Sequence, residues 1–141
     1  MMEISGTSRI LAGAILITVP SIEFGGTFLL KMLRASDPAY VSNPLRHDLF
    51  RAGHAHAGVL VILSLVCQLL ADAAALPAGL LWIARLGAPC AAILMPLGFF
   101  LSVASPEAAR PNRLIALVYA GAAILALGMV VLGIGLIRAA L

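Results

Sequence analysis

The chain has 141 residues, of which 62% are hydrophobic and 11% charged, with a formal net charge of +3 and a mean hydropathy of +1.10. Soluble domains are roughly half apolar and a quarter charged, and a soluble core of this length could not bury so much apolar side chain. The composition therefore excludes an ordinary soluble domain and indicates an integral membrane protein. Basic residues that flank membrane spans account for the positive charge without a nucleic-acid partner.

Four segments are long enough to cross a bilayer, which takes about 20 helical residues. They cover approximately residues 10–30, 49–70, 79–104 and 114–137. Each is almost continuously apolar and lacks the strict alternation of barrel strands. Helices satisfy their own backbone hydrogen bonds in lipid. We therefore predict an all-α fold: a single domain, residues 1–141, that forms a four-helix transmembrane bundle in up-down-up-down order.

The second span has a recognisable start. Ser42 or Asn43 is suited to cap a helix whose first turn contains Pro44. We expect this helix to begin about one turn before the membrane.

Lysine and arginine are unevenly distributed between the two ends of the bundle. Three lie at the end of the termini, Arg9, Arg85 and Arg138, and six lie at the other end, Lys31, Arg34, Arg46, Arg51, Arg110 and Arg113. The positive-inside rule predicts that the first and third connections are cytoplasmic and that both termini lie outside the cell (inner) membrane.

Glu23 and two histidines are the main candidates for a functional site. Glu23 lies within the first apolar segment, and His54 and His56 lie near the start of the second. Ionisable groups in a span are costly and usually face the bundle interior. Glu23 precedes Lys31 by eight residues, about 12 Å, and the histidines follow Phe50 by about 6 to 9 Å. Glu23 and an imidazole are therefore expected at a similar depth.

Helix geometry separates the two histidines. Two residues correspond to about 200° of rotation, so a regular helix cannot direct both His54 and His56 at one metal ion. His54 belongs to a polar stripe that spans about 60°, and we therefore favour it as the partner of Glu23. The stripe contains His47, Arg51, His54, Gly58, Gln68 and Asp72.

Three functions are compatible with a Glu–His pair in lipid. The first, which we favour, is a haem or transition-metal site in a membrane oxidoreductase, with His54 and His56 as cofactor ligands and Glu23 as an additional metal ligand. A single haem would then need both histidines on opposite faces, a non-histidine ligand or a second subunit. The second is a membrane enzyme for a lipophilic substrate, in which Glu23 and His54 are acid and base and Arg51 holds an anionic group. The third is a structural or accessory subunit, in which Glu23 and one histidine only connect two helices.

Glycines and prolines suggest how the helices pack. Gly121, Gly128 and Gly135 recur every seven residues, which favours close packing within the chain or in a homo-oligomer or membrane complex. Pro20, Pro89 and Pro96 are expected to loosen their helices and widen the middle of the bundle.

Asp72 and Arg85 lie on either side of the second connection. Arg85 either extends towards the membrane surface or pairs with Asp72 across that connection.

Two motifs carry a resemblance. IEFGG at residues 22–26, followed by FRAGHAHAG at residues 50–58, resembles a group of small bacterial four-span membrane proteins with no assigned activity. The intramembrane histidines are also weakly similar to those of haem-copper oxidase core subunits, which present histidines to haem and copper. The second resemblance implies only that histidines within a span can serve as ligands.

Overall fold

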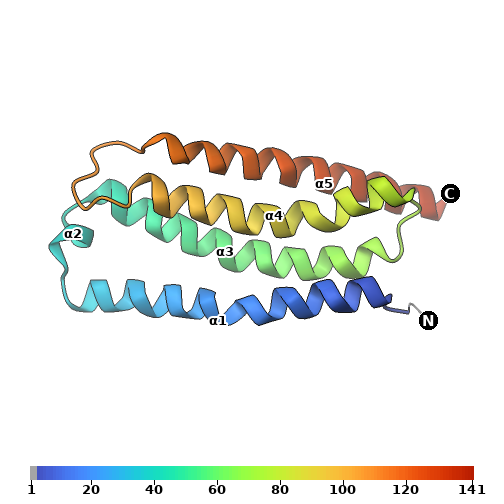
Figure 1. Ribbon diagram of the computed structural model, residues 1–141, viewed down its shortest axis with the longest axis horizontal. Coiled ribbons are helices and arrows are strands. Elements are labelled where there is room, and N and C mark those ends of the chain that lie inside the picture. The colour runs from blue at the N-terminus through green and yellow to red at the C-terminus, as the bar shows by residue number, and fades with distance from the viewer. Residues whose placement is uncertain (1–2) are drawn as a thin grey trace.

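The structure is a computed structural model that describes residues 3–141 (Figure 1). Its long helices are α1 (Gly6–Arg34), α3 (Pro44–Ala71), α4 (Ala78–Ser102) and α5 (Ala116–Ala140). A short helix, α2 (Pro38–Val41), precedes α3, and a 3₁₀ turn, η1 (Arg113–Ile115), leads into α5. Within the described range there is no strand, and four helices are long and apolar enough to cross a membrane. The predicted all-α four-helix bundle is confirmed.

Local capping explains where the helices begin. The Asn43 side chain accepts a hydrogen bond from the Arg46 N–H at 3.1 Å, and Pro44 is the first residue of α3. This confirms the predicted start of the second span. Ser5 caps α1 by accepting from the Ser8 N–H at 3.2 Å. These side chains satisfy N–H groups that a helix cannot pair at its own N-terminus.

Helix α4 lies between α3 and α5 and has its most extensive contacts with them. A Cβ added to Gly128 would lie 2.9 Å from the Gly87 Cα, so the backbones of α4 and α5 touch at these two glycines. Gly121 meets Met95, and Gly135 meets Leu76. The glycines at residues 121, 128 and 135 are all buried inside the chain. Of the two predicted uses of this face, the structure shows packing within the chain, so the glycines do not form an open surface for another copy.

Helix α1 is the least embedded of the long helices and packs mainly on α3. Its buried residues are Ser8 near one end and Leu29 and Met32 near the other. Pro20 lies inside the helix between these two regions, where no residue of α1 is buried. Helix α1 is therefore held at its two ends and only loosely covered in its middle.

The end of the bundle that carries α2 is closed by an apolar cluster of Leu29, Met32, Tyr40, Phe50 and Val103. The buried Arg46 side chain donates hydrogen bonds to the carbonyls of Val103 and Ala39, at 3.2 and 2.8 Å. The first turn of α1 and the last turn of α5 lie at the opposite end (Figure 1).

Candidate functional site

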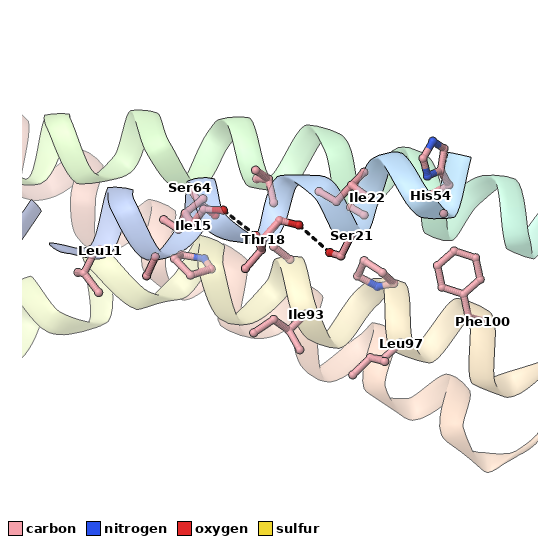
Figure 2. Close-up of a pocket in the computed structure, with 17 residues that line it drawn as sticks. Leu11, Ile15, Thr18, Ser21, Ile22, His54, Ser64, Ile93, Leu97 and Phe100 are labelled. Atoms are coloured by element: carbon pink, nitrogen blue, oxygen red, sulfur yellow. Dashed lines mark hydrogen bonds between the residues drawn. The ribbon is translucent and has the colours of Figure 1, made fainter. Parts of the chain in front are cut away.

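A cavity of about 520 Å³ lies between α1, α3 and α4, beside the loosely covered middle of α1 (Figure 2). Volumes of about 300–1,000 Å³ are usual for small-molecule pockets. Two prolines of α4, Pro89 and Pro96, line it. One face of α1 forms a wall and contributes Leu11, Ile15, Thr18, Ser21, Ile22 and Gly25.

The cavity opens sideways between α1 and α4. Two residues of its α4 wall are largely accessible from outside, Ile93 at 61% and Leu97 at 42%. Thr18 and Ser21 on the α1 wall are exposed as well. The opening therefore lies within the candidate membrane spans, at the outer surface of the bundle.

Most polar groups of the wall are bonded to their own helix. The Thr18 hydroxyl donates to the Ile15 carbonyl and the Ser21 hydroxyl to the Thr18 carbonyl, each at 2.6 Å (Figure 2). The Ser64 hydroxyl donates to the Leu60 carbonyl at 2.6 Å. A hydroxyl has one hydrogen to donate, so these side chains have no donor left for a guest molecule.

His54 is the ionisable residue of the cavity wall. Its ring rests against the glycine pair of α1: a Cβ added to Gly26 would lie 3.1 Å from Cε1 and Nε2, and one added to Gly25 would lie 3.6 Å from Nδ1. Hydrogen bonds are present for the rings of His47 and His56, but residues 3–141 supply none to the ring of His54. Neither ring nitrogen of His54 therefore has a hydrogen-bond partner among the described residues.

His56 faces a different neighbour, as helix geometry predicted. Its Nδ1 is 2.7 Å from the Ala52 carbonyl, and its ring lies 4.9 Å from the ring of Phe99 on α4. His56 is not part of the cavity wall. The two imidazoles therefore serve different helix contacts.

Glu23 and Arg51 lie outside the cavity wall, and both side chains are exposed. Among the described residues no hydrogen bond or ion pair joins Glu23 to a histidine. The positive charge of Arg51 affects Tyr40. Burial raises the pKa of the Tyr40 phenol, and this charge opposes that rise. Nor does the described part of the chain bring together three or more His, Cys, Asp or Glu side chains that could hold a metal ion. In this structure Glu23, His54 and His56 do not form a shared ligand set.

A second polar cluster, the polar clasp, consists of Ser5, Ser8, Gln68, Asp72 and Arg85. It contains the Asp72–Arg85 ion pair, which is one of the two arrangements that the sequence predicted for Arg85. Arg85 Nη2 lies 2.6 Å from Asp72 Oδ1, and the Arg85 and Asp72 side chains are 5% and 6% exposed. This confirms pairing across the second connection. Arg85 also donates to the Ser8 hydroxyl.

The rest of the polar clasp connects three helices. The Ser5 N–H donates to Asp72 at 3.0 Å, the Ser8 hydroxyl donates to the Gln68 carbonyl at 3.0 Å, and Gln68 Nε2 donates to the Arg85 carbonyl at 2.8 Å. Burial raises the pKa of the Asp72 carboxyl, but the hydrogen bonds from Ser5, Arg85 and Ser8 outweigh it and hold that pKa well below its usual range. Every member of the clasp has a partner, so its role is to join α1 to α3 and α4.

Sequence reasoning did not identify Ser5, Ser8, Thr18, Ser21 or Ser64. The wall of α1 carries a signal that could have been used: residues 11, 14, 18, 21 and 25 recur every three to four positions, and the small or hydroxylated ones interrupt an apolar helix. Ser64 follows His54 by ten residues and faces the same cavity.

Comparisons with known proteins give no match: no family model, no curated protein and no solved structure is similar to this chain.

Proposed function

We propose that this integral membrane protein binds a lipophilic molecule in the cavity between α1, α3 and α4, with His54 as its polar contact. One observation carries the proposal: an imidazole without a hydrogen-bond partner lies on the wall of an otherwise apolar cavity of about 520 Å³. A polar group without a partner in an apolar setting is costly, and a bound ligand would remove that cost. Apolar pockets with a few polar groups are the usual form of small-molecule sites.

The lateral opening supports uptake from the bilayer. A molecule dissolved in lipid reaches the cavity between α1 and α4 at Ile93 and Leu97 without crossing water. Because lipid tails and the cavity wall are both apolar, the transfer of the ligand's apolar surface from lipid into the cavity contributes little binding free energy. Selectivity then depends on shape and on the hydrogen bond to His54.

The same imidazole supports a second candidate, a haem protein with a redox role in which His54 is the single axial ligand. The separation of His54 from His56 favours one axial histidine over two. A bare transition-metal ion has less support because the described residues group no three donors. An acid–base enzyme would rely on His54 rather than on a Glu23–His54 pair, since Glu23 is exposed outside the wall.

The test is to purify the protein in mild detergent, identify co-purifying small molecules by mass spectrometry, and record a visible absorption spectrum. The variant Ala57→Phe fills the cavity from α3, and Ala55→Phe is its control because Ala55 is an exposed residue outside the wall. We expect a co-purifying lipophile that Ala57→Phe removes and Ala55→Phe retains. Equal amounts of ligand in both variants, or none in the unmodified protein, would refute the proposal. A Soret band lost in His54→Leu but kept in His56→Leu would favour the haem protein.

A further inference from the structure

We infer that the ligand is an uncharged single-chain amphiphile with a carbonyl headgroup, of the alkyl- or prenylquinone type. Its headgroup lies beside His54 and Phe100, and its chain runs along α1 towards Leu11. This inference rests on the proposed function and adds the chemical class and the orientation of the ligand.

The shape of the cavity favours one long chain. Along α1 its wall runs from Leu11 to Gly25, fourteen residues or about 21 Å at the rise of an α-helix. Figure 2 places Leu11 at one end and His54 with Phe100 at the other. A volume of about 520 Å³ distributed over that length is narrow. It fits an extended hydrocarbon chain better than a compact polycyclic molecule.

The side-chain donor that has no partner in the chain lies at one end of the cavity, at His54. The hydroxyls of Thr18, Ser21 and Ser64 use their hydrogens on their own helices. The ring N–H of His54 is therefore the donor available to a guest, and its natural partner is a carbonyl oxygen. The headgroup is thus expected beside His54 and the chain in the apolar remainder.

Charge excludes an anionic headgroup such as a carboxylate or phosphate. The wall contains no lysine or arginine. Lys31 and Arg34 line a separate groove near the end of α1, and Arg85 is paired with Asp72. An anion beside His54 would lack a permanent cation in a low-dielectric setting, which disfavours its binding. The headgroup is therefore neutral.

Phe100 contributes an aromatic ring to the same end of the cavity as His54 (Figure 2). The Phe100 ring packs edge-on against Phe50, with centroids 5.3 Å apart, and a Cβ added to Gly53 would lie 3.1 Å from its Cε2. These contacts hold the ring in place at the cavity wall. A flat quinone ring can pack against such a face, whereas an aliphatic ketone or aldehyde gains less there. The combination of a ring donor, a fixed aromatic face and a long apolar groove points to a quinone.

The test compares two probes of equal chain length, a decyl-substituted benzoquinone and decanoic acid, by titration calorimetry of the purified protein in micelles. We expect the quinone to bind more tightly than the acid. His54→Leu should weaken quinone binding about tenfold, the scale of one lost hydrogen bond, and His54→Gln, which keeps a donor, should restore part of it. His56→Leu, which removes an imidazole of the same helix outside the cavity, should leave quinone binding unchanged.

The two proposals fail in different ways. The inferred headgroup is wrong and the lipophile site stands under the following result. Both probes bind, Ala57→Phe abolishes the binding of both, and either the acid binds as tightly as the quinone or His54→Leu has no effect on quinone binding. If neither probe binds, or if Ala57→Phe leaves both affinities unchanged, the proposed function itself is wrong.

Discussion

Replacing Asp72 by asparagine isolates the energetic contribution of the ion pair in the polar clasp. The Asp72 and Arg85 side chains are 6% and 5% exposed, so solvent screens their 2.6 Å contact very little. Removing one partner of a buried pair leaves an uncompensated charge and typically costs about 3–5 kcal/mol. Arg85 retains its hydrogen bonds to Ser8 and Gln68. We therefore expect Asp72→Asn to lower the free energy of unfolding by about 3 kcal/mol, at the lower end of that range.

The assay is reversible unfolding in mixed micelles at pH 7, followed by circular dichroism. Asp48→Asn is the matched control, because Asp48 is also paired, with His47, but its side chain is 73% exposed. Exposed pairs contribute little to stability, so this control should match the unmodified protein. The double variant Asp72→Leu/Arg85→Leu should recover most of the lost stability, because replacing a whole buried pair by apolar side chains is often neutral. A loss below about 1 kcal/mol in Asp72→Asn would refute the reasoning that the pair is desolvated.

Three further predictions concern the pH dependence of the clasp, the packing of α5 and the orientation of the chain. Because the pKa of Asp72 is lowered in the folded state, the contribution of its carboxylate to the free energy of unfolding is complete above the unfolded pKa of about 4 and is lost as the pH falls through the folded value. The difference in unfolding free energy between the unmodified protein and Asp72→Asn should therefore be constant from pH 8 to 5 and shrink below pH 4. A difference that shrinks already between pH 7 and 5 would contradict this. Gly128→Ala should lower the free energy of unfolding by about 1–3 kcal/mol because its Cβ would meet the Gly87 backbone at 2.9 Å. Its control, Gly133→Ala, has nothing within 4 Å of the added Cβ and should be neutral or slightly stabilising in the same micelle assay. Equal effects of the two variants would be inconsistent with close packing of α4 and α5. With Cys67 and Cys90 replaced by serine, a cysteine at Ala140 should react with an impermeant maleimide in intact cells and one at Ser105 should not, if the basic connections are cytoplasmic; the reverse pattern would invert the predicted orientation.

The sequence predicted the elements of the fold well because hydropathy and capping are local signals. Asn43 and Pro44 mark the start of α3 within the chain itself, and the four apolar segments are visible without any tertiary contact. The 200° rotation between His54 and His56 was also sufficient to predict that they face different neighbours.

The candidate site was less predictable because it depends on contacts between helices. Similar depth placed Glu23 near His54, but depth does not fix the rotation of α1, which presents Gly25 and Gly26 to the imidazole and leaves Glu23 exposed. Likewise the seven-residue glycine spacing identified a packing face, but only the position of Gly87 shows that its partner is α4. The alternative of an Asp72–Arg85 pair was available from the sequence because the connection between them is short.

The polar clasp has a consequence for the order in which the protein assembles. Ser5, Ser8, Gln68 and Asp72 all precede Arg85 in the chain, so they emerge from the ribosome before the cation that neutralises Asp72. Until α4 enters the bilayer, the only clasp bonds available between α1 and α3 are those from Ser5 to Asp72 and from Ser8 to the Gln68 carbonyl. Insertion of the third span then supplies the guanidinium that joins all three helices, so the clasp is complete only once more than half of the chain has been made.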